Sequence, residues 1–190
     1  MNSITSLYPG DFNTGSLRDI LFVPVNQVDQ IKAPVEGILP FDALQFDGSA
    51  AVLYSLNFTE DTAECSFEQA QAAPGSLFRC RISASVPKDY QFRPLDFSSL
   101  DNLRFFVITR DSNNRSRLHG YINPQGEKYG MRLSVDFSTS RQRAGYNGYK
   151  VEFFLDSPLR PMPIADPAGL PINPPTGPGV ENDPNPPPID

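Results

Sequence analysis

Alternating apolar and polar residues recur in short segments along the middle of the chain. The clearest are 131–137 (MRLSVDF) and 148–155 (GYKVEFFL), in which every second side chain is apolar. This two-residue period is typical of a strand with one face buried and the other in water. Residues 80–86 show the same period, with Cys80, Ile82, Ala84 and Val86 on one side and arginine or serine on the other. We therefore expect three half-buried strands in these segments.

Turn residues separate the strand patterns and predict hairpins. Pro74-Gly75 is a strong turn signal between two extended arms, 67–73 and 76–86. The polar run 111–117 (DSNNRSR) follows an apolar strand at 103–109 and precedes a returning strand at 117–122. Two antiparallel hairpins follow from these spacings.

Further apolar runs complete the predicted fold. Residues 20–25 (ILFVPV) and 51–58 (AVLYSLNF) read as strands, and Pro24 limits the first to a sheet edge or a strand end. Residues 25–31 predict one helical turn or a loop, and Ser98 or Ser99 could cap a short helix ending near Asn102. The total is about seven or eight short strands with at most one short helix. We predict an all-β fold, an antiparallel β-sandwich or barrel.

The chain divides into three parts by composition. Residues 1–19 are polar and turn-rich and predict an N-terminal arm or loop, while 20–157 form the β-rich body. Residues 158–190 contain 12 prolines, so this segment cannot bury a core and favours extended geometry. A stiff arm loses little entropy when it is laid across a neighbouring subunit. We expect either such a strap or an untethered linker.

Charge is distributed unevenly along the sequence. The net charge is -6, yet residues 1–75 have a balance of -8 and residues 76–157 a balance of +5. A bipolar molecule could dock head to tail with its own copies, whereas a folded surface could also mix both sets. An apolar run long enough to span a bilayer is missing, and so is the pattern of a secretory signal, so we expect no membrane partner.

Catalytic and metal-binding motifs are not evident, and we predict no enzyme activity, no cofactor and no metal. The chain has one histidine, His119, in a strand pattern, and two cysteines, Cys65 and Cys80, without Cys-x-x-Cys spacing. We expect reduced thiols, with a cross-strand disulfide as the alternative. Nucleotide-binding and hydrolase signatures are lacking.

Two clusters of charge are candidates for contacts. Glu60, Asp61, Glu64 and Glu68 could hold calcium or act as an acid/base pair, but a solvated acidic face is expected. Arginine forks suit carboxylates and phosphates, and a pI near 4.8 favours an acidic protein partner over nucleic acid. The candidate assembly interface comprises these arginines and prolines of the arm: Arg110, Arg115, Arg117, Arg141, Arg143, Pro171, Pro174 and Pro175.

Three features of the C-terminal half of the body form a pattern: the turn 111–115, the strand 133–139 and Gly148-Tyr149 leading into 151–153. In these residues the chain resembles small β-rich proteins encoded in the structural-gene modules of Bacteroidetes phages and prophages. Residues 20–31 resemble the opening strand and turn of the same group. Ala144 and the long proline arm depart from that pattern.

This resemblance implies a virion structural subunit of the tail or neck that is made in the host cytoplasm. It further implies a homo-oligomer, a ring or a stacked tube, that contacts other virion proteins. A capsid decoration protein is an alternative within the same particle. A non-enzymatic sugar- or protein-binding β-sandwich, with Tyr121, Tyr129, Tyr146 and Tyr149 as stacking platforms, is an alternative of another class.

Overall fold

The computed structural model describes residues 16–47, 53–72, 75–87, 100, 102–139, 147–165 and 172–173. These segments are almost entirely antiparallel β-structure, which confirms the predicted all-β class. The helical structure among them is one 3-10 turn, η1 (Val25–Gln27). None of it is long and apolar enough to cross a membrane.

The strands outnumber the seven or eight predicted because several contain only two to four residues. They are β1 (Leu17–Pro24), β2 (Val28–Ile31), β3 (Leu44–Phe46), β4 (Leu53–Ser55), β5 (Glu64–Ala72), β6 (Gly75–Pro87), β7 (Arg104–Asp111), β8 (Ser116–His119), β9 (Tyr121–Ile122), β10 (Lys128–Tyr129), β11 (Met131–Thr139), β12 (Asn147–Ser157), β13 (Met162–Ile164) and β14 (Ile172–Asn173).

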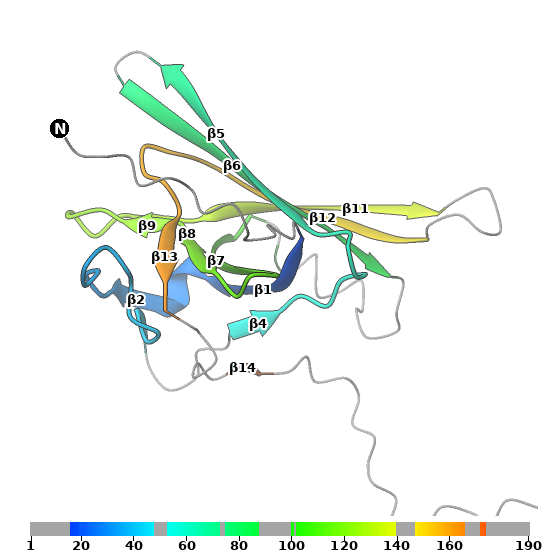
Figure 1. Ribbon diagram of the computed structural model, residues 1–190, viewed down its shortest axis with the longest axis horizontal. Coiled ribbons are helices and arrows are strands. Elements are labelled where there is room, and N and C mark those ends of the chain that lie inside the picture. The colour runs from blue at the N-terminus through cyan, green and yellow to red at the C-terminus, as the bar shows by residue number, and fades with distance from the viewer. Residues whose placement is uncertain are drawn as a thin grey trace, which may run out of the picture.

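One large sheet carries the fold. Its order is β14-β4-β1-β7-β11-β12-β6-β5, and β8 and β13 branch from β7 beside β11. The sheet has open ends at β14 and β5, so it is not a closed barrel, and the sandwich-like alternative describes it better. Figure 1 shows the β5–β6 hairpin and β14 on opposite sides of the molecule.

The central strands β1 and β7 are buried on both faces. Each has a continuous apolar run rather than an alternating one, as expected for a strand covered from both sides. Alternate residues enter two separate cores: Phe22 and Phe105 lie in the first, and Val23 and Phe106 in the second. These two strands therefore form the shared wall between the cores.

The first core lies between the central strands and the curled half of the sheet, β11, β12 and β6. Phe105 meets Phe22 edge-to-face with ring centroids 5.5 Å apart, and Phe153 from β12 joins the pair. The second core is closed by β2, β3 and β13. Burying large aromatic side chains in this way is the main stabilising contribution to such a fold.

The predicted alternation is confirmed in the long strands. On β6, Cys80, Ile82, Ala84 and Val86 are buried and Arg81 is exposed, although Ser83 on the predicted polar side is also buried. Pro24 is the last residue of β1, which lies between β4 and β7, so this proline marks a strand end and not a sheet edge. The predicted helical turn at 25–31 is η1 followed by β2, and most of the predicted helix near 98–102 lies outside the described residues.

Both terminal arms contribute strands to the body. β1 starts at Leu17, within the segment predicted as an N-terminal arm. β13 lies within the proline-rich segment and pairs with β8, with Ile164 buried in the second core. The Leu39 amide donates to the Pro163 carbonyl at 2.9 Å, and the Ala165 amide donates to the Leu39 carbonyl at 2.8 Å. The folded body thus continues at least to residue 165.

Candidate functional site

Three side chains that are far apart in the sequence meet at the edge of the first core. We call Cys65 of β5, Cys80 of β6 and His119 of β8 the thiol–imidazole cluster. In the β5–β6 ladder, Cys65 lies opposite Ile82 and Cys80 opposite Phe67, so the two thiols share one face, two residues apart. His119 is brought to them because the β5–β6 hairpin curls over β8.

The imidazole of His119 is held at both nitrogens. Its Nδ1 is 3.0 Å from the Cys80 sulfur, and its Nε2 is 2.8 Å from the hydroxyl oxygen of Thr109. The Cys65 sulfur lies 4.0 Å from Nε2. Only 1% of His119 is exposed, and a buried imidazole is stable only when such partners satisfy it. The thiol and the hydroxyl can each donate or accept, so either neutral tautomer is accommodated.

The two thiols differ strongly in acidity. The hydrogen bond from Cys80 lowers the pKa of Cys65 well below that of a free thiol, and His119 and Arg117 act in the same direction against the effect of burial. The same hydrogen bond raises the pKa of Cys80, and burial adds to this rise. The pair therefore holds one proton in common, with negative charge favoured on Cys65.

Sequence reasoning missed this cluster. The absence of Cys-x-x-Cys spacing and of a second histidine argued against a ligand set, yet the three donor atoms lie within 4.8 Å of one another. The predicted turn at Pro74-Gly75 could have indicated that the two thiols are close. When Ala72 pairs with Gly75, the two-residue period places Cys65 and Cys80 on the same face of the hairpin. Both cysteines are free thiols, as expected, and the alternative disulfide is not formed.

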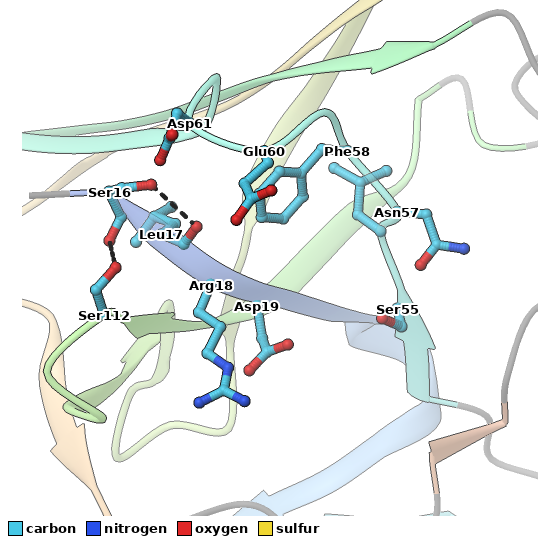
Figure 2. Close-up of a pocket in the computed structure, with 11 residues that line it drawn as sticks. Ser16, Leu17, Arg18, Asp19, Ser55, Asn57, Phe58, Glu60, Asp61 and Ser112 are labelled. Carbon is cyan, nitrogen blue, oxygen red and sulfur yellow. Dashed lines mark hydrogen bonds between the residues drawn. The ribbon is translucent and has the colours of Figure 1, made fainter.

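A pocket of about 460 Å³ lies between the start of β1 and the loop that follows β4. Glu60 and Asp61 lie on one side of β1 and Asp19 on the other (Figure 2). Glu64, from the same predicted acidic cluster, instead accepts a hydrogen bond from the Ser83 hydroxyl at 3.2 Å. Among the described residues these carboxylates do not converge on one point, which supports the solvated-face interpretation.

The structure describes three of the five predicted interface arginines, Arg110, Arg115 and Arg117. Arg110 lies 3.9 Å from the Asp19 carboxylate, and the Arg117 guanidinium lies over the Phe67 ring at 5.5 Å. Arg115 is exposed at the hairpin tip, where its backbone amide donates to the Asp111 carboxylate. The other predicted interface residues lie outside the described segments: Arg141, Arg143, Pro171, Pro174 and Pro175.

The acidic and basic parts of the sequence mix on the folded surface. Glu68 on β5 lies directly opposite Arg79 on β6, and Asp19 faces Arg110. These contacts favour the mixed-surface alternative over a bipolar molecule. The tyrosines predicted as stacking platforms are also partly used internally, because Tyr121 and Tyr129 stack on each other at 4.8 Å. Tyr149 packs against the first core, and Tyr146 lies outside the described residues.

The proline-rich segment contacts the body a second time at β14. Ile172 pairs with Leu53 and Asn173 with Tyr54, in parallel, so the segment adds a strand to the β4 end of the sheet. Figure 1 shows β14 beside β4. Leu53 is fully buried, whereas 39% of Tyr54 is exposed.

Several exposed apolar side chains lie in one turn, which we call the apolar turn (residues 35–41). Val35 and Ile38 exchange backbone hydrogen bonds of 2.9 and 3.0 Å around Glu36 and Gly37, both at positive φ. Val35 is 71% exposed, and Ile38 and Phe41 are about half exposed. A hydrogen-bonded turn presents these side chains to solvent in a fixed arrangement.

Comparisons of this chain with protein-family models, with curated proteins and with solved structures find no match.

Proposed function

We propose that this protein is a structural subunit of a phage particle, in the tail or in the neck that joins tail to head. Its subunits oligomerise into a ring or tube, and the C-terminal segment straps one subunit to the next. The observation that carries the proposal is the pairing of β14 with β4, by which an extended proline-rich segment adds a strand to the sheet. The strand and turn residues that resemble phage structural proteins support the same assignment.

Strand addition is a general way for one chain to hold another. Backbone hydrogen bonds supply affinity, and the pockets for alternate side chains supply register. An element that pairs with its own body can pair with the same site on a neighbour, because the two interfaces are identical. In the proposed assembly, β14 of one subunit lies along β4 of the next, and the prolines keep the connecting segment extended.

The apolar turn is a second surface that fits an assembly role. Monomeric proteins rarely leave neighbouring large apolar side chains in water without a purpose. Val35, Ile38 and Phe41 are presented by a fixed turn, so their burial by a neighbour costs little ordering entropy. A capsid decoration protein would use the same two surfaces, and particle location separates these alternatives.

The proposed role is non-catalytic. The 460 Å³ pocket is lined by polar and charged side chains together with Leu17, Leu56 and Phe58, and neither cysteine nor His119 lies among its lining residues. The thiol–imidazole cluster is set in the protein interior, with His119 and Cys80 both buried. A substrate has little access to such a cluster, which fits a subunit that binds neighbours better than one that transforms a substrate.

The experiment compares three purified chains by light scattering and negative-stain microscopy. They are the full chain, a chain that ends at Ala165, and a full-length variant with Ile172→Pro and Asn173→Pro. The truncation keeps β13, which belongs to the folded body. The double variant keeps the length and the proline-rich composition but removes both backbone donors of β14.

We expect rings or tubes from the full chain and folded monomers from the other two. Circular dichroism controls for folding of the body. Oligomers of equal mass from all three chains would contradict the strap, and a folded monomer from the full chain at high concentration would contradict assembly through its own copies.

A further inference from the structure

We propose that Cys65, Cys80 and His119 bind one zinc ion. The inference rests on the position of three zinc-type donors, two sulfurs and an imidazole nitrogen, within 4.8 Å of one another. They come from three strands, and no short sequence motif joins them. The proposal is independent of the assembly role.

The donor chemistry selects the ion. Thiolate and imidazole are the ligands that Zn²⁺ prefers in proteins, whereas Ca²⁺ and Mg²⁺ require oxygen. In a tetrahedral zinc site, ligand atoms lie about 3.5–3.8 Å apart, because zinc–sulfur and zinc–nitrogen bonds are about 2.3 and 2.0 Å long. The Cys80 sulfur lies 3.0 Å from Nδ1 of His119, slightly below this range, and all three donor atoms lie within 4.8 Å of one another. Small side-chain movements are enough to close the site.

Thr109 supplies the partner that a metal-binding histidine needs. Such a histidine uses one ring nitrogen for the metal and donates the other N–H to a nearby acceptor, which fixes its tautomer. The Thr109 hydroxyl oxygen, 2.8 Å from Nε2, is that acceptor. Nδ1, which faces the Cys80 sulfur, is then the ligand nitrogen.

A fourth ligand can come from water. A cavity of about 10 Å³ borders Cys80 and His119 and is also lined by Tyr121 and Ser157. This is close to the smallest volume that holds one water molecule. In the zinc-bound state both sulfurs are thiolates, and the one proton that the pair shared passes to solvent. The ion would fasten the curled β5–β6 hairpin to β8 and so close the edge of the first core.

The test uses the full chain, reduced with a phosphine and stripped of metal with a chelator. Zinc content is measured after incubation with Zn²⁺ and desalting, and Co²⁺ serves as the spectroscopic probe. We expect one zinc per chain and a cobalt spectrum with sulfur-to-cobalt charge-transfer bands and the visible bands of tetrahedral coordination. Zinc at about 100 times its dissociation constant should raise the melting temperature by about 5–10 °C.

Variants separate ligands from neighbours. Cys65→Ser and His119→Gln should each lose the zinc-dependent rise in melting temperature. Thr109→Val should keep one zinc per chain but weaken binding by about 10–100-fold. Ser116→Ala alters a buried residue of β8, the strand of His119, but lies outside the cluster. This variant should bind zinc like the unaltered chain.

Zinc uptake by the unaltered chain tests the proposal even if a variant of a buried residue does not fold. Less than a tenth of an equivalent of zinc in the folded, reduced chain, with no sulfur-to-cobalt bands, would overturn the proposal. A Cys65–Cys80 disulfide in the oxidised chain, combined with no zinc uptake after reduction, would overturn it as well.

Discussion

Gly120 sets the position of His119, which it follows directly at the end of β8. Its φ of +103° is a conformation that side chains other than glycine rarely adopt. A Cβ at this position would lie 2.6 Å from a ring carbon of Phe106 and 2.8 Å from the Tyr129 carbonyl oxygen. The turn from β8 into β9 is therefore packed directly on the second core. This packing holds the backbone next to His119 in place.

The matched pair Gly120→Ala and Gly126→Ala tests this packing. Both glycines have positive φ, but a Cβ on Gly126 would meet nothing within 4 Å. We expect Gly126→Ala to lower the free energy of unfolding by about 1–2 kcal/mol through backbone strain alone. Gly120→Ala should cost a further ~1–3 kcal/mol through overpacking. Urea denaturation measures both, and equal losses would show that the close contact with Phe106 does not matter.

At the scale of elements, β13 shows where the body gives way to the arm. Ile164 is 5% exposed in the second core, whereas Leu159, five residues earlier, is 49% exposed. Composition does not distinguish these positions, since both lie among prolines. The difference comes from pairing with β8 and from the two backbone hydrogen bonds with Leu39.

Ile164→Ala and Leu159→Ala should accordingly differ in stability. Removing the buried isoleucine side chain leaves a cavity, and we expect a loss of about 2–4 kcal/mol. Leu159→Ala removes an exposed side chain and should lower the free energy of unfolding by less than about 1 kcal/mol. Thermal and urea unfolding of the chain ending at Ala165 provide the measurement. A negligible loss for Ile164→Ala would mean that residues 162–164 do not belong to the folded body.

The long strands were predictable because apolar and polar residues alternate along each of them. β6, β11 and β12 follow the two-residue period, and the solid apolar runs mark the doubly covered strands β1 and β7. Strands such as β13 and β14 contain two or three residues and exist only through distant partners, β8 and β4. A local pattern cannot specify such pairing, because its stability comes from the sheet that the short segment joins.

The candidate site was less predictable for the same reason. Hairpin parity places Cys65 beside Cys80, so two of the three donors follow from local information. His119 joins them only after the sheet curls and brings β6 over β8. Two arginines of the predicted interface, Arg110 and Arg117, have partners within the molecule, Asp19 and Phe67, that no local pattern indicates.

At the scale of the whole molecule, the edge of the large sheet at β4 is the surface on which the proposed assembly depends. An uncovered edge is a ready template for a further strand, and proteins cover it or use it. Here β14 covers β4 with a segment from the proline-rich C-terminal region. The uneven charge of the sequence adds little support to the proposed assembly, because acidic residues of β5 lie beside basic residues of β6.

The most direct test asks whether β14 of one subunit reaches β4 of another. Chains with a photoreactive phenylalanine analogue in place of Asn173, labelled with ¹⁵N, are mixed with a tenfold excess of unlabelled natural chains and irradiated after assembly. We expect cross-linked peptides that join labelled position 173 to unlabelled peptides containing Tyr54, its partner across the ladder. Cross-links found only between labelled peptides, in species with the mass of a single chain, would contradict the strap.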